Sequence, residues 1–566
     1  MEFFDFENST IVEIEKYFES LTNARKINLL KTEDAKKLYQ KILTILKSFF
    51  QTNYSKNKFH LFYFTDNIEE LKRRHEFIQE CLNLELDDLK IKEIKLPNLA
   101  VKNVAFITTD YEKYKQLIEK YKNFPIFYVE SNQDLIIAKD YVQIRTDSYE
   151  VANLLNNAVF SEEPFPEYHI NRLLYILEEL KSIKPYLSEK LVIKISKLEE
   201  FNFNFIDLRS LIRNKLDEIN KNILQRIKQE QFDGTELLNV ISSGTSDKIK
   251  KYLYEEIEVL EKELKDKQIN INLSFIELKL PLTINEQDFE QEVNAFEINQ
   301  MYHYFNEVNK LYSIIGNSDE FIQEIKSEIY ELDFKLGIKN IVKHFDLKKP
   351  EFSNKGFSIK QGKNIFLLAE NIEVEKIDYD VNVDSVLLTG ANSGGKTTLL
   401  QLIFQVHVLA MMGFYVPGNV QLSIYDEIYY FSKPTGKTDA GAFETLLRTF
   451  SKIPKENKKL ILADEIEAIT EPGAAAKILI SILKWFKNTE SLVIIVTHLA
   501  EDIKKYLEPG MRIDGIQAIG IDNGKLIVNR SPLKGVVAKS TPELIVQKLK
   551  DQDPFFEFIF KNLKEL

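Results

Sequence analysis

The sequence predicts a multidomain α/β protein with two α/β regions separated by a long helical region. Short apolar runs alternate with a helical segment from about His60 to Glu150. Helical spacing of apolar residues then dominates from about Tyr168 to Lys339. Beyond about Phe352, strands and helices alternate again around a glycine-rich loop. The chain has 566 residues, which is sufficient for roughly three or four domains.

The amino-acid composition limits the kinds of function that this protein can have. The formal net charge of −12 argues against a broadly basic surface, so any contact with nucleic acid should be confined to local basic clusters. The single cysteine, Cys81, excludes an intramolecular disulfide framework and suits a reducing cytoplasm. No apolar run approaches the length of a membrane span, so we expect no membrane partner.

The first two predicted domains are residues 1–55 and residues 56–150. In the first domain, apolar residues recur at helical spacing from Ile11 to Phe50. The period changes in the second domain, which we expect to be a small α/β domain, and we find no catalytic constellation in it. Its expected elements are strands at His60–Phe64, Asn103–Ile107 and Pro125–Val129 and a helix at Tyr111–Lys122.

The third predicted domain, residues 151–345, is almost entirely helical. Residues 208–227 keep one apolar face, and residues 253–264 alternate steps of four and three, as in a short coiled-coil seam. Breaks at Gly234 and at Ser242–Ser246 lie between these helices. The pattern indicates long helices that run out to a tip and return, and a plain helical bundle is the alternative.

The fourth predicted domain, residues 346–540, carries the motif G-x-x-x-x-G-K-[ST] between an apolar strand, Ser385–Thr389, and a helix. The glycines let backbone N–H groups point at phosphate oxygens, and the helix N-terminus adds partial positive charge. We therefore expect ATP to bind here, with Lys396 on the β- and γ-phosphates and Thr397 on Mg²⁺. The expected nucleotide contacts are Gly390, Ala391, Asn392, Ser393, Gly394, Gly395, Lys396, Thr397 and Thr398.

The other candidate metal-binding and catalytic residues lie at the ends of two later predicted strands. One apolar run ends in Asp464 and Glu465. After a phosphate loop, this pattern predicts that Asp464 holds Mg²⁺ beside Thr397, and that Glu465 orients and activates the attacking water. The next apolar run ends at His498, which can sense the γ-phosphate by hydrogen bonding. The predicted reaction is Mg²⁺-dependent ATP hydrolysis, with Lys396, Glu465 and His498 as its catalytic residues.

Four segments together resemble the MutS ATPases of DNA mismatch repair and their paralogues. They are Leu388–Leu399, with Asn392 at the third loop position; Gly413–Pro417 after the loop helix; Leu462–Glu465 followed by Thr470–Gly473; and Thr497–His498. The resemblance covers roughly residues 365–530. It extends more weakly to Asp207–Arg213, which is similar to the lever helix of the family.

The resemblance implies an architecture and a set of partners. It implies an ABC-like ATPase domain at residues 346–540, and a lever and clamp domain at residues 151–345 that grips duplex DNA. It also implies a homodimer, with a possible dimer contact through residues 541–566. In the family, a signature segment that usually reads Ser-x-Phe reaches the nucleotide of the partner subunit. The matching positions in this chain are Gly441 and Phe443, so a glycine stands where a serine is usual.

Within the family, Ala391 and residues 470–475 look like those of archaeal and bacterial paralogues outside the main mismatch-repair branch. The tripeptide Phe275–Glu277 fits the mismatch-reading wedge of the family but lies in the helical region, where packing explains it better. We therefore expect a role in repair or recombination at the nucleoid, with double-stranded DNA as the partner. Mismatched, branched and recombination-intermediate forms are all candidates, and the branched and recombination forms are favoured over single mismatches. The chain stops at Leu566, so we expect no Smr nuclease.

A basic cluster near the expected tip is the candidate DNA contact. Lys248, Lys250 and Lys251 would bind phosphates and so supply affinity without reading sequence. The acidic residues Glu255 and Glu256 follow directly, so a solvated helix face is the alternative.

Two other classes of protein stay open. An ABC- or SMC-type ATPase with a structural or chromosome-organising role would carry a Leu-Ser-Gly-Gly signature, which does not occur between Leu400 and Lys459. The intact pair Asp464 and Glu465 argues against a module that holds nucleotide without turnover.

Overall fold

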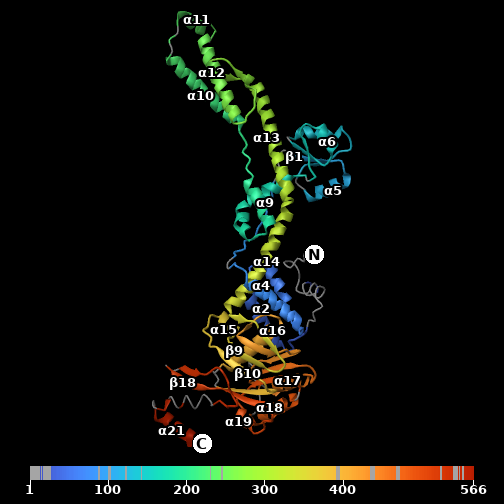
Figure 1. The fold of residues 1–566 in the computed structure, drawn as a ribbon, viewed down its shortest axis with the longest axis vertical. Coiled ribbons are helices and arrows are strands. Elements are labelled where there is room, and N and C mark those ends of the chain that lie inside the picture. Colours follow the sequence, from blue (N-terminus) through green and yellow to red (C-terminus); the bar gives the residue numbers. More distant parts are fainter. Residues whose placement is uncertain are drawn as a thin grey trace. The chain divides into compact units, whose positions relative to one another are not determined.

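The computed structural model divides the chain into two compact units, whose helices and strands are labelled in Figure 1. One unit consists of Met1–Ile91 with Tyr330–Leu566, and the other of Lys92–Ile329. The structure describes residues 13, 16, 27–86, 89–99, 104–121, 124–141, 143–162, 164–229, 231, 233–243, 246–390, 395–433, 440–466, 472–487, 489–522, 525–538, 546, 549, 550 and 553–565.

The first unit is built on a six-stranded sheet in the order β14-β15-β16-β11-β17-β20, in which only β20 is antiparallel to its neighbour. Its strands are β14 (Glu427–Phe431), β15 (Lys459–Asp464), β16 (Leu492–Val496), β11 (Ser385–Gly390), β17 (Met511–Ile516) and β20 (Leu533–Lys534). The inner strands are continuous apolar runs because both faces of the sheet are covered. On β11, Leu388 joins the core that contains α16 (Lys396–Met411), whereas Leu387 joins the core that contains α18 (Pro472–Phe486).

The N-terminal helices belong to this same unit. They are α2 (Glu33–Lys47), α3 (Asn53–Lys58) and α4 (Ile68–Leu82), and their apolar residues share the core of α16. Just before α2, Leu30 bridges to Ile428 of β14 and so covers the edge of the sheet, although a helix was expected there. The described residues between 56 and 91 therefore belong to the same compact unit as the phosphate-loop domain.

The prediction of a strand at His60–Phe64 is wrong. A 3₁₀ turn, Phe59–Leu61, stands there instead. Phe59 and Phe62 are buried and meet the ring of Phe414 edge-on, with ring centroids 5.7 and 5.2 Å away. The apolar spacing of this segment thus reflects an aromatic cluster against the end of α16 and not a sheet.

A second sheet and several connecting elements complete the first unit. The sheet has the order β10-β9-β13-β8. The further elements are β7 (Leu347–Lys348), β8 (Glu351–Ser353), β9 (Phe357–Gly362), α15 (Ile365–Ala369), β10 (Ile377–Val381), β12 (Val416–Pro417), β13 (Asn419–Ser423), α17 (Ala440–Ser451), α19 (Ala500–Lys504), β18 (Ala518–Asp522), β19 (Lys525–Val528) and α21 (Pro554–Glu565). The helix α14 (Ser318–His344) contains the residue at which the two units are divided.

The second unit contains a small parallel sheet in the order β2-β1-β3-β4. Its elements are β1 (Val104–Thr108), α5 (Tyr111–Lys120), β2 (Ile126–Tyr128), β3 (Gln143–Thr146), α6 (Tyr149–Leu154) and β4 (Ala158–Phe160). Alternate residues of β1 enter two separate apolar cores, Phe106 on one face and Ala105 on the other. The expected strands at Asn103–Ile107 and Pro125–Val129 correspond to β1 and β2.

Long helices form the rest of the second unit. They are α7 (Pro166–Tyr175), α8 (Leu177–Ile183), α9 (Glu189–Glu200), α10 (Leu208–Gln229), α11 (Gly234–Ser243), α12 (Asp247–Asp266) and α13 (Glu286–Ile315), with the short strands β5 (Ile276–Glu277) and β6 (Thr283–Ile284). One apolar core joins α10, α12 and the start of α13, and it buries Phe275 against Phe289. Packing therefore accounts for the Phe275–Glu277 tripeptide. No described helix is both long and apolar enough to cross a membrane.

Candidate nucleotide site

The phosphate loop connects β11 to α16 at the carboxyl edge of the six-stranded sheet. Gly395 caps α16 with φ of +88°, a left-handed conformation that glycine adopts at least cost. Lys396 is buried, and its Nζ donates to the carbonyl of Gly390 at 2.8 Å. Burial lowers the pKa of Lys396, and the neighbouring Glu465 opposes that shift. The other expected loop contacts, Ala391, Asn392, Ser393 and Gly394, lie outside the described residues.

Thr397 and Asp464 meet across the sheet edge. The Thr397 hydroxyl donates to Oδ2 of Asp464 at 2.6 Å. Asp464 Oδ1 is buried and has no hydrogen-bond partner among the described residues. Burial raises the pKa of Asp464, and the hydrogen bond from Thr397 acts in the opposite direction. An unpartnered carboxylate oxygen beside a hydroxyl suits Mg²⁺, which takes one or two protein oxygens and completes its shell with phosphate and water.

The Glu465 carboxylate lies close to two lysines and a histidine. Its side chain is mostly buried, and its backbone has φ of +45°. His498 Nε2 lies 2.6 Å from Oε1, Lys396 Nζ lies 3.4 Å from the same oxygen, and Lys433 forms an ion pair with Oε2. Burial raises the pKa of Glu465, but Lys433, His498 and Lys396 outweigh it, and the net shift is downward. Glu465 is therefore ionised at neutral pH and can accept a proton.

Two residues of this site, Lys433 and Arg530, belong to none of the sequence motifs and were not predicted. Lys433 follows β14, the strand next to β15, and only the strand order brings it to Glu465. Arg530 follows β19, and its Nη1 lies 3.1 Å from the position that a Cβ on Gly395 would take. Arg530 also forms an ion pair with Glu375 at 3.2 Å. The only sequence signal for Lys433 is a lysine shortly after an apolar strand, which is too common to identify a site.

The remaining motif residues are placed as follows. Thr398 lies in the first turn of α16, where its carbonyl accepts from the Asn364 amide at 2.8 Å. Gly441 and Phe443 lie at the start of α17, and the preceding residues 434–439 are outside the described part of the chain. The side chains of Gly441 and Phe443 also lie outside the described residues, so the role of this segment at a partner's nucleotide stays a prediction.

The Gly413–Pro417 segment has a structural role. Gly413 ends α16 with φ of +71°, and a Cβ there would lie 2.7 Å from Cδ of Arg74. Arg74 donates to the carbonyl of Met412 at 2.8 Å, which ties α4 to the end of the loop helix. Val416–Pro417 then pairs with β7. The segment thus anchors the far end of the helix whose first residue is Lys396.

The candidate DNA contacts lie in the other unit. Lys248, Lys250 and Lys251 occupy the first turns of α12, beside the short helix α11. Lys250 and Lys251 are exposed, whereas Lys248 is half-buried and donates to the carbonyl of Gln231 at 3.4 Å.

The acidic residues after this cluster have their own partner. Glu255 and Glu256 both form ion pairs with Arg226 of α10, at 3.0 and 3.3 Å. Within the described part of the chain, no acidic side chain forms an ion pair with Lys250 or Lys251.

A parallel sheet with a phosphate loop, a hydroxyl–carboxylate pair and a glutamate–histidine pair along one edge defines a P-loop ATPase. A profile of the ATPase family associated with various cellular activities (AAA) matches residues 386–521. The DNA-binding protein MutS2 of Pyrococcus furiosus is 31% identical over 555 residues, which cover 91% of this chain and 95% of that protein. The chain belongs to the MutS2 family, and it is an ATPase. The resemblance to MutS proteins is thereby confirmed.

Longer bacterial relatives match over shorter stretches. An endonuclease MutS2 of Clostridium botulinum is 25% identical over 249 residues, or 42% of this chain and 30% of that protein. An endonuclease MutS2 of Lactobacillus acidophilus is 24% identical over 307 residues, or 49% of this chain and 38% of that protein. The chain thus spans well under half the length of these two relatives.

Proposed function

We propose that this chain is a MutS-type DNA-binding ATPase that couples ATP binding and hydrolysis to clamping of DNA. The observation that carries the proposal is the joining of Thr397 to Asp464 and of Glu465 to His498 along one sheet edge. The chain is similar to the DNA-binding protein MutS2 of Pyrococcus furiosus over nearly the whole length of both proteins. This similarity supports the proposal that the chain binds DNA.

In this proposal each residue at the sheet edge has one task. Lys396 exchanges the carbonyl of Gly390 for the β- and γ-phosphates. Thr397 and Asp464 hold Mg²⁺, which supplies positive charge to the phosphate oxygens when bound. Glu465 accepts a proton from the attacking water, since its carboxylate is ionised at neutral pH.

His498 and Lys433 position the base. Each contacts a different oxygen of Glu465, so together they fix the plane of its carboxylate. Arg530, close to Gly395, offers a further cation at the end of the loop. We propose that it contacts the bound nucleotide, and that ATP draws it away from Glu375.

The helical region is proposed as the lever and clamp, with limits near residues 151–345. The helices α10 and α12 are tied by an apolar core and by ion pairs such as Lys215 to Glu263 at 2.9 Å. A helix pair stiffened in this way can transmit movement along its length. Lys250 and Lys251 at the start of α12 would contact DNA phosphates, because the acidic residues Glu255 and Glu256 pair with Arg226 and not with these lysines.

The substrate, the assembly state and the other domain limits are also proposed. We propose a homodimer that acts in the cytoplasm at the nucleoid, on branched or recombination-intermediate duplexes. The C-terminal segment, residues 541–566, is the proposed dimer contact. The nucleotide domain is proposed to span residues 346–540, preceded by an N-terminal helical segment and a small α/β domain.

A gel-shift comparison tests the DNA part of the proposal. Perfect duplex, mismatched duplex and four-way DNA are each titrated with the protein at low and high salt, with and without ATP. The expected result is binding that weakens steeply with salt, because phosphate contacts release counterions. ATP turnover without binding of any of the three DNA forms would favour an ABC- or SMC-type ATPase with another role.

A further inference from the structure

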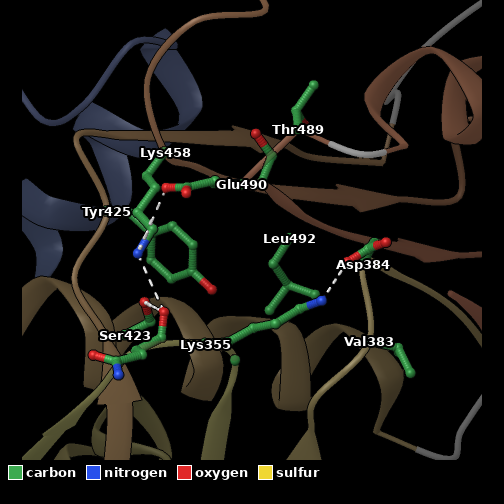
Figure 2. A pocket seen from close by; sticks show the side chains of 12 residues that line it. Lys355, Val383, Asp384, Ser423, Tyr425, Lys458, Thr489, Glu490 and Leu492 are labelled. Atoms are coloured by element: carbon green, nitrogen blue, oxygen red, sulfur yellow. Dashed lines mark hydrogen bonds and ion pairs between the residues drawn. The ribbon is translucent and has the colours of Figure 1, made fainter.

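A polar cavity lies at the edge of the six-stranded sheet opposite to the nucleotide site (Figure 2). Its volume is about 400 Å³. Asp384, Lys458 and Ser491 line it, and each directly precedes one of the strands β11, β15 and β16. The carboxyl ends of these same strands carry Gly390, the pair Asp464–Glu465, and His498. The cavity is therefore separate from the nucleotide site but shares three strands with it.

Hydroxyl groups form the inner wall of this cavity. Ser491 is 4% exposed, and its Oγ is buried with no hydrogen-bond partner among the described residues. Tyr425 is 2% exposed, and Figure 2 shows its hydroxyl directed toward the space beside Leu492. None of the hydrogen bonds within the described part of the chain involves that hydroxyl. A buried hydroxyl without a partner is costly, so Ser491 Oγ calls for a ligand or ordered water, and the Tyr425 hydroxyl of the same lining can bind the same occupant.

Two lysines add positive charge at the rim. Lys458 Nζ donates to the carbonyl of Asn354 at 3.2 Å and lies 3.9 Å from Glu490, whose side chain is 80% exposed. An exposed ion pair of that length is weak, so Lys458 can exchange Glu490 for another anion. Lys355 lies across the cavity and is paired with Asp384 at 2.6 Å, which cancels the charge of that carboxylate.

The side chains that can bind a ligand in this cavity are therefore mostly hydrogen-bond donors. Burial raises the pKa of Tyr425, so its hydroxyl stays protonated at neutral pH and can donate. Ser491 and the Lys458 ammonium donate as well. Three donors in one cavity lining, with the Asp384 carboxylate paired to Lys355, favour an oxyanion, and about 400 Å³ leaves room for a small organic group attached to it.

We propose that this cavity binds a small phosphorylated molecule, whose phosphate is held by Lys458, Tyr425 and Ser491. Tyr425 also packs against His407 of α16, with ring centroids 5.5 Å apart. An occupant of the cavity thus contacts a side chain, Tyr425, that packs against the C-terminal half of the loop helix.

Calorimetric titration of the full chain tests this site. Ribose 5-phosphate, inorganic phosphate and ribose are titrated separately, with the phosphate loop filled by Mg²⁺ and a non-hydrolysable ATP analogue. The titrations are repeated in Lys396→Ala, so the result does not depend on ATP binding at the loop. Tyr425→Phe and Ser491→Ala each remove one donor with little change of volume, and Lys458→Met removes the charge. Lys360→Met, at an exposed lysine of β9, is the matched control.

The expected result is binding of ribose 5-phosphate that each of the three cavity variants weakens by about 3- to 30-fold and that Lys360→Met leaves unchanged. Equal binding of inorganic phosphate would also support the site and would make free phosphate its ligand. The proposal is overturned if neither phosphate compound binds at millimolar concentration. It is equally overturned if ribose binds as well as its phosphate, or if the cavity variants bind like the wild-type chain.

Discussion

The hydroxyl of Thr397 donates to the carboxylate of Asp464 at 2.6 Å, although 67 residues separate them in the chain. Asp464 ends β15, whereas Thr397 lies in the first turn of α16, which follows β11, and β16 lies between β11 and β15 in the sheet. This contact leaves the buried Oδ1 of Asp464 without a hydrogen-bond partner among the described residues. A hydroxyl and a free carboxylate oxygen so close together are what a magnesium ion needs.

Asp464→Asn should therefore impair magnesium use. We expect the Mg²⁺ concentration for half-maximal ATPase activity to rise and the turnover number to fall at least about 100-fold, since the metal contributes several kcal/mol of charge stabilisation. The measurement is ATPase rate against Mg²⁺ concentration, with Asp502→Asn, on α19, as the control. Unchanged Mg²⁺ dependence in Asp464→Asn would remove this residue from the metal site.

Lys396→Ala should weaken ATP binding. Its ammonium is the buried cation of the loop helix, and we expect about 10- to 100-fold weaker binding because a charged hydrogen bond to phosphate is lost. Equilibrium binding of a fluorescent ATP analogue measures the effect, and Lys360→Ala is the control. Far-ultraviolet circular dichroism checks that the variant folds. Wild-type affinity would show that the loop does not hold the triphosphate.

Glu465→Gln should bind ATP but hydrolyse it slowly. The amide keeps the shape of the side chain but cannot accept the proton of water, so we expect hydrolysis about 100- to 10,000-fold slower. A single-turnover assay separates this loss from binding, and Glu501→Gln, at an exposed residue, controls for surface charge. Hydrolysis at the wild-type rate would assign the base elsewhere.

His407 should make the stability of the protein depend on pH. Burial lowers the pKa of His407 to about 4, below its ordinary 6.5. As pH falls from 6.5 toward 4, the unfolded chain therefore takes up this proton before the folded chain does, and the free energy of unfolding drops by up to about 3 kcal/mol.

Replacing His407 by leucine should flatten that dependence. Denaturant unfolding at pH 7.5 and at pH close to 4.5 measures the difference for each chain, and His303→Gln, on α13, serves as the exposed control. The histidines His75 and His169 have similarly lowered pKa values, so part of the dependence should remain. An unaltered slope in His407→Leu would contradict the assignment.

Lys250→Ala with Lys251→Ala should weaken DNA binding and reduce its salt dependence. Each lost phosphate contact lowers the slope of log affinity against log salt by about 0.9, so we expect a reduction of about 2. Fluorescence anisotropy of labelled duplex over a salt series measures the slope. Lys262→Ala, at an exposed lysine farther along α12, should have no effect. An unchanged slope in the double variant would leave α12 without a DNA role.

Much of the fold near the nucleotide could be predicted from sequence. The apolar strand before the loop and the helix after it correspond to β11 and α16, and the run that ends in Asp464 corresponds to β15. Local pattern suffices there because a strand buried on both faces must be continuously apolar. The same logic fails at His60–Phe64, where aromatic burial against Phe414 produces an apolar run without a strand.

The sequence by itself determined that this chain carries a phosphate loop, a carboxylate pair and a histidine at successive strand ends, and that these resemble MutS proteins. Only the tertiary structure decided which groups meet: Lys433 and His498 on Glu465, Arg530 beside Gly395, and residues 56–91 with the nucleotide unit. The physical reason is that strand order and side-chain contact arise from burial between segments far apart in the chain. Hydrophobic spacing records that a residue is buried, but it does not record its neighbour.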